Sequence, residues 1–151
     1  MRTYLVVIDD SDEARVALRF AARRAAKTEG SVEVLAVVPP QDFVQWGGVQ
    51  AAIEEEQKLR IEGVVSGAVG EIFDAAGIKP AIVLRQGDAV KVVNEYLAGR
   101  DDIAALVLGA APGGDPGPLV AHFTGKDAGN MACPVMMIPG SLTDERLEQL
   151  S

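Results

Sequence analysis

The chain has 151 residues, of which 48% are hydrophobic and 24% charged, and its formal net charge is -8. This composition is that of one globular domain and excludes an intrinsically disordered chain. The negative charge argues against nucleic-acid or anionic-membrane partners, because phosphate groups repel a protein that has no basic patch.

Cys133 is the single cysteine, which excludes an internal disulfide and fits a reducing cytoplasm. It precedes Pro134 and a strand-like run, so we interpret it as a small buried thiol. No apolar run reaches the roughly 18 residues that a membrane helix needs, and the N-terminal run is too short for a signal peptide. We therefore expect a cytoplasmic protein.

Residues 4–8 form an apolar run with β-branched side chains, which predicts a first strand covered on both faces. The helix that follows begins either with a capping box of Asp10 and Glu13 or, equally well, with Ser11 as its cap. It ends near Glu29 and Gly30, a usual glycine stop. Four arginines cluster on this helix, and we interpret them as its solvated face: Arg15, Arg19, Arg23 and Arg24.

A second strand is predicted over residues 31–38, where Pro39 and Pro40 end it. Residues 49–76 then have a helical pattern whose buried face comprises Ile61, Val65, Ala68 and Ile72. Three glycines in this helix each lower its propensity by roughly 1 kcal/mol and are compatible with a kink: Gly63, Gly67 and Gly70.

The second half of the chain continues the alternation of strands and helices. Strands are predicted over residues 81–84, 103–108 and 134–138. Gly87 and Asp88 begin the helix after the third strand, and its expected buried face comprises Val90, Val93 and Leu97. A short helix is expected to run to about residue 131 after the fourth strand, and another from residue 143.

This alternation predicts an α/β fold with one doubly wound, Rossmann-like sheet of five parallel strands and helices on both faces. The expected strand order is 3-2-1-4-5. Residues 1–140 form the domain, and residues 141–151 a short polar tail. Ligands of such sheets bind beyond the carboxyl ends of the strands, at the switch point in strand order.

Residues 106–126 are a candidate ligand-binding segment at that edge, because a strand there leads through a loop of glycines and prolines into a helix. Glycine lets backbone N–H groups approach a phosphate, and a helix N-terminus favours negative charge. A long surface loop without a ligand explains the same residues equally well.

Several motifs together resemble the universal stress protein family. Residues 6–11 resemble its first strand and Asp-Gly-Ser turn, with Asp10 where glycine is usual. Residues 32–38 resemble its second strand, and residues 85–88 the Gly-Asp that begins a main helix. Residues 106–109 and 133–139 resemble its fourth and fifth strands. The resemblance covers nearly the whole chain and implies an adenine nucleotide α-hydrolase-like fold.

In nucleotide-binding members this resemblance implies an ATP site. Asp9 would contact the nucleoside, and Val37 would offer a backbone contact to adenine. The phosphates would lie on a motif of Gly, two residues, Gly, nine residues, then Gly-Ser or Gly-Thr. Gly109 fits the first position, but Pro112 stands at the second, and no register supplies the final pair.

Other residues of this loop still leave a phosphate site conceivable. Gly113 and Gly114 could form a nest of N–H groups with Gly117, while Thr124 and Lys126 could supply a hydroxyl and a charge. Asp9, Asp10 and Asp115 crowd the region with negative charge, so ATP there would need Mg²⁺. Helix capping and turn formation explain these three carboxylates more simply.

Further candidates have simple structural interpretations beside their functional ones. His122, the single histidine, could meet an anion or be an ordinary loop residue. Phe43 and Trp46 could stack on adenine or dock their loop on the core. No second histidine completes a zinc site with Cys133, and no base activates Ser11 or Thr124 as a nucleophile.

We therefore expect a universal stress protein that acts as a homodimeric regulatory or interaction module in a stress response. The dimer would form through residues 135–138, an apolar edge strand. The broken phosphate motif favours a module that binds a protein partner and no nucleotide over one switched by ATP with Mg²⁺. Slow ATP hydrolysis is the least favoured alternative, and no catalytic or metal residue is assigned.

Overall fold

The five strands form one parallel sheet in the order β3-β2-β1-β4-β5, which confirms the predicted order. A computed structural model describes residues 2–40 and 47–151 of the chain. The central strand β1 pairs with β2 on one side and β4 on the other, so strand order reverses there. The strands are β1 (Thr3–Ile8), β2 (Ser31–Val38), β3 (Ala81–Gln86), β4 (Ile103–Ala110) and β5 (Val135–Pro139).

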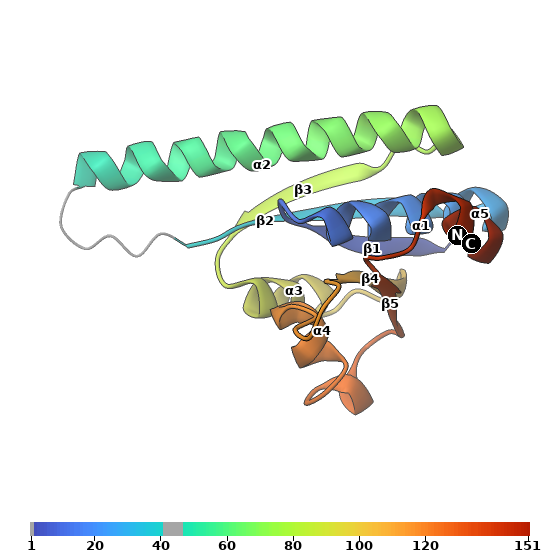
Figure 1. Ribbon diagram of the computed structural model, residues 1–151. Coiled ribbons are helices and arrows are strands. Elements are labelled where there is room, and N and C mark those ends of the chain that lie inside the picture. Colours follow the sequence, from blue (N-terminus) through green and yellow to red (C-terminus); the bar gives the residue numbers. More distant parts are fainter. Residues whose placement is uncertain (1, 41–46) are drawn as a thin grey trace.

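Helices cover both faces of the sheet (Figure 1). One face carries α1 (Asp12–Thr28), α2 (Gly47–Ala76) and the C-terminal α5 (Asp144–Leu150). The other face carries α3 (Ala89–Leu97) and α4 (Pro118–Phe123), followed by a 3₁₀ turn, η1 (Ala128–Asn130). Alternate residues of β1 enter the two cores, as the two-residue period of a strand requires: Val6 lies under α1, and Leu5 faces α3.

The start and the end of α1 settle one open choice and correct one expectation. Ser11 is the N-cap, and its hydroxyl accepts a hydrogen bond from the Ala14 N–H at 3.3 Å. Asp10 does not cap the helix; it forms an ion pair with Arg60 of α2. At the other end Glu29, and not Gly30, adopts the left-handed conformation, with φ 56°.

The arginines of α1 do more than form a solvated face. Arg15 forms an ion pair with Glu71 of α2, and Arg19 reaches both Glu71 at 3.5 Å and Asp144 of α5 at 3.3 Å. Arg23 donates to the Asp144 carbonyl at 3.1 Å. The row therefore links α1 to both neighbouring helices, which the sequence alone did not indicate because the acidic partners lie 52 to 125 residues away.

The helix α2 is one continuous element of 30 residues, drawn without a sharp kink in Figure 1. It forms the outermost layer on its side of the sheet. Its buried face is the predicted one: Ile61, Val65, Ala68 and Ile72 are all buried in the core beneath it.

Two expectations for the second half need correction. Val92 is buried in α3 with Val93 and Leu97, whereas Val90 is half-buried. The helix after β4 ends at Phe123 and does not reach residue 131, because Thr124 is its C-cap and a turn follows. The tail forms a helix as expected, and its Leu147 is fully buried in the core shared with α1. Among the described residues, no helix is long and apolar enough to cross a membrane.

Candidate functional site

Two adjoining hollows lie where the switch-point rule places a ligand, beyond the carboxyl ends of the central strands. The larger has a volume of about 240 Å³ and the smaller about 100 Å³. Four residues line both of them and so join the two spaces: Val7, Asp9, Ala89 and Leu119.

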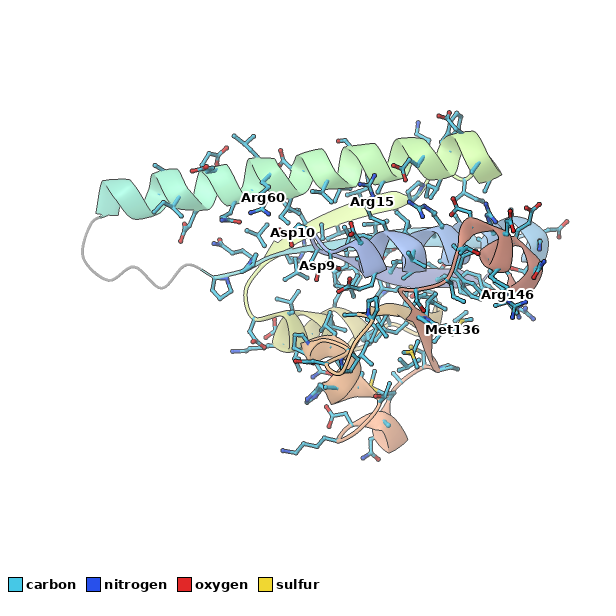
Figure 2. All side chains as sticks on the ribbon, viewed as in Figure 1. Asp9, Asp10, Arg15, Arg60, Met136 and Arg146 are labelled. Atoms are coloured by element: carbon cyan, nitrogen blue, oxygen red, sulfur yellow. The ribbon has the colours of Figure 1, made fainter. Side chains whose placement is uncertain are left out.

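The larger hollow contains the part of the predicted site that would hold a nucleoside. Asp9 directly follows β1, Val37 lies near the end of β2, and both line this space with Pro39 and Asp88. Asp9 Oδ1 accepts hydrogen bonds from the N–H of Ser11, at 2.9 Å, and from its hydroxyl. The carboxylate is thereby fixed at the start of α1, where Figure 2 labels it.

The predicted phosphate loop lies beside the smaller hollow and closes on itself. The Ala111 N–H donates to the Pro116 carbonyl at 3.1 Å, and the Gly117 N–H donates to Asp115 Oδ1 at 3.0 Å. Pro118 is the first residue of α4 and has no N–H to offer. The short helix therefore begins with one donor taken by a carboxylate and the next one missing.

Gly109 lines the smaller hollow, but close packing within the fold already requires glycine at this position. A Cβ atom at this position would lie 2.1 Å from the Glu13 carbonyl oxygen and 3.0 Å from the Ala14 nitrogen. The first turn of α1 thus rests directly on the end of β4.

The remaining predicted phosphate ligands lie elsewhere. Gly113 and Gly114 are exposed in the loop and line neither hollow. Thr124 lies at the far end of α4, where its hydroxyl donates to the Val120 carbonyl at 2.6 Å. His122 Nε2 lies 2.7 Å from Asp127 Oδ2, and Lys126 is exposed. Phe43 and Trp46 lie outside the described residues, so their stacking role stays a prediction.

The charge around the two hollows is negative. Asp9 and Glu13 line the smaller space, and Asp9 and Asp88 the larger. Within the described part of the chain, no lysine or arginine lines either hollow. The same residues contain no group of three or more acidic, histidine or cysteine side chains that could hold a metal ion. Such a site suits an uncharged group better than a phosphate chain.

Glu13, Asp88 and Leu119 were not proposed as site residues from the sequence. Asp88 was recognised there as the start of a helix, and it caps α3 by accepting from the Lys91 N–H at 3.1 Å. A usable signal did exist for Asp88, because it follows β3 and the carboxyl ends of parallel strands meet at one edge.

A separate charge cluster surrounds Glu33, near the start of β2 and away from these hollows. Arg100 pairs with Glu33 at 3.1 Å and with Asp102 at 2.7 Å, and the Tyr96 hydroxyl donates to Glu33. Burial raises the pKa of Glu33, but the hydrogen bonds from Arg100 and Tyr96 outweigh burial and leave it below its usual value. Arg100 also lowers the pKa of Asp102 to about 2. This cluster ties the end of α3 to the sheet.

Cys133 is buried in the core under α4, as its position before Pro134 suggested. Burial raises the pKa of its thiol above the usual value. A thiol of this kind is protonated at neutral pH and is a poor nucleophile.

The sequence profile of the universal stress protein family matches residues 1–139. The chain belongs to this family. No curated protein matches the chain. Among solved structures, the universal stress protein UspA from Lactobacillus plantarum has a TM-score of 0.76 at 16% identity, covering 91% of this chain and 97% of that one.

Two further structures are similar and carry nucleotides. A universal stress protein family protein from Arabidopsis thaliana, solved with AMP bound, has a TM-score of 0.56 at 14% identity, covering 97% and 95% of the two chains. A universal stress protein solved in complex with cAMP has a TM-score of 0.55 at 19% identity, covering 93% and 98%. At these identities the likeness establishes the fold.

Proposed function

We propose that this universal stress protein is a cytoplasmic, homodimeric interaction module of a stress response, and that its loop after β4 does not hold nucleotide phosphates. The observation that carries the proposal is the internal closure of this loop. Asp115 takes the Gly117 N–H, and Pro118 removes the next donor of α4.

A triphosphate in the smaller hollow would have to displace Asp115 and then lie beside the carboxylates of Asp9 and Glu13. Carboxylates and phosphates that share one small hollow repel each other strongly, because water is partly excluded there. The described lining offers no lysine or arginine to offset this repulsion. We infer that the family's switch by ATP is lost here and that protein contacts remain.

The dimer is proposed to form through β5, which pairs only with β4 in the described sheet. Its outer edge presents unpaired backbone groups, and its Met137 is 47% exposed. A second copy that adds its own β5 would satisfy those groups. Met137→Lys is expected to halve the mass in sedimentation equilibrium. Leu150→Lys on α5, a similarly exposed leucine, should leave the mass unchanged.

A nucleotide-binding switch is the second candidate, and one arrangement favours it. Asp9 and Val37 line the same 240 Å³ hollow, as the family resemblance implies for a nucleoside site. The related structures with AMP and with cAMP support this alternative. In that case ATP with Mg²⁺ would alter the partner surface.

The deciding experiment is mass spectrometry of the small molecules released when the freshly purified protein is denatured, followed by calorimetric titration with MgATP and with adenosine. We expect no bound nucleotide and no heat from millimolar MgATP. Asp115→Ala frees the Gly117 N–H. If the closed loop is what excludes phosphate, this variant should bind MgATP more tightly than the unmodified chain. Stoichiometric AMP or ATP, lost in an Asp9→Ala variant, would contradict the proposal and establish the switch.

A further inference from the structure

The outer face of α2 carries a straight row of exposed residues with no partner in the described chain. The row consists of Leu59, Gly63, Ser66, Gly70 and Phe73, all exposed. Their spacing of four, three, four and three residues is the period of a helix that packs against another helix. Leu59 is 58% exposed and Phe73 55%, unusually high values for such large apolar side chains.

Nothing in the described monomer requires glycine at the two glycine positions of this row. A Cβ atom added at Gly63 or Gly70 would meet nothing within 4 Å, and neither residue has a positive φ. Glycine in a helix interior weakens the helix, so its presence here carries a cost with no internal gain. Small residues at such positions let a second helix approach closely.

Beside the row lies an apolar groove of about 450 Å³ between α2 and the edge strand β3. Val69, Gly70 and Phe73 line it from α2, while Lys79 and the half-exposed Ile82 line it from the other side. Figure 1 shows α2 as the outermost layer, and no other helix or strand of the described residues lies over its outer face.

The two large apolar side chains of the row lie at equal distances from Ser66, and the charges at the two ends of α2 favour a second copy of this chain as the occupant. Leu59 lies seven residues before Ser66 and Phe73 seven residues after it. An antiparallel second copy centred on Ser66 therefore brings each Leu59 against the other copy's groove at Gly70 and Phe73. At each end the same arrangement brings the exposed Glu55 near the other copy's Lys79, a pair of opposite charges.

We propose that the outer face of α2 is a homotypic interface, in which a second copy of this chain packs its own α2 antiparallel, with Ser66 on the two-fold axis. Such an interface is isologous and closes on itself. It lies by the β3 edge of the sheet, opposite β5, so it is separate from the proposed β5 dimer. Both contacts together would give a larger assembly.

Disulfide trapping tests this geometry directly. In a Cys133→Ala background, Ser66→Cys places two thiols at the axis, within disulfide reach. Asp74→Cys is the matched control, because it is exposed on the same helix but its two copies would lie about 24 Å apart. We expect the Ser66→Cys chain to form a covalent dimer at least about tenfold faster than the control. Equal rates would overturn the proposal.

A second measurement does not depend on thiol chemistry. Leu59→Glu puts a charge against the apolar groove of the other copy and is expected to raise the dissociation constant of this contact by about tenfold or more in sedimentation velocity. Leu150→Glu is its control on α5. Since neither residue lies on β5, a change specific to Leu59→Glu supports the α2 contact whether or not the β5 dimer exists. An unchanged constant, or an equal change in both variants, would overturn it.

Discussion

Replacement of Gly109 by alanine separates a packing role from a phosphate-binding role at the first position of the family's loop motif. The added methyl group would lie 2.1 Å from the carbonyl oxygen of Glu13 and 2.4 Å from its carbonyl carbon. These are backbone atoms in the first turn of α1, so no side-chain rotation relieves the contact. The first turn must move away from β4, which loosens the cap at Ser11 and the wall of the smaller hollow.

The cost of this clash is estimated from overpacked cores, which lose about 1–3 kcal/mol. Because the contact involves backbone, we expect the upper end, about 3 kcal/mol. For a domain of this size each kcal/mol lowers the melting temperature by about 2–4 °C, which predicts a loss of roughly 10 °C. Urea unfolding followed by circular dichroism, without any nucleotide, measures the free energy.

The control is Gly114→Ala in the same loop, where an added Cβ meets nothing within 4 Å and φ is not positive. It is expected to unfold within about 0.5 kcal/mol of the unmodified chain. If Gly109→Ala is as stable as this control, the packing argument fails. The glycine would then need a ligand to explain it, and the nucleotide switch would gain support.

Three further predictions concern other parts of the fold. Glu33 has a lowered pKa in the folded chain, so it contributes stability at neutral pH that is lost as the pH falls below about 4.5; Glu33→Gln should flatten acid unfolding curves in this range. Gly63→Ala and Gly70→Ala should each raise the free energy of unfolding by about 1 kcal/mol while weakening self-association in sedimentation velocity. A variant that raises both the free energy of unfolding and the strength of self-association would contradict the α2 interface. Leu147→Ala should cost about 3 kcal/mol in urea unfolding and Leu150→Ala close to none, since Leu147 is fully buried.

Much of the fold was predictable because its signals are local. The continuous apolar run of β1 and the alternation of strands with helices imply a parallel sheet, and Ser31–Val38 has the predicted bounds. Asp88 is the N-cap that the Gly-Asp motif indicated. In contrast, the choice between Asp10 and Ser11 depended on Arg60, a residue 50 positions away that draws Asp10 aside.

The site was less predictable because its parts depend on distances across the chain. The switch-point rule brings Asp9 and Val37 together, since both end neighbouring strands. Thr124 was placed near them by counting along a motif, but the short α4 carries it to the opposite end of that helix. The ion pairs of Arg15 and Arg19 were missed for the same reason as that of Asp10.

Glycine shows why the sequence left the function open. Gly109 is required by contact with Glu13, whereas Gly117 is required by a backbone φ of 105° at the start of α4. Gly63 and Gly70 satisfy neither condition in the described monomer and lie on its surface. A sequence pattern counts these residues alike, yet the first two stabilise the fold without any ligand. The glycines that still need an external reason lie on α2, where close packing against a second copy of the chain would supply one.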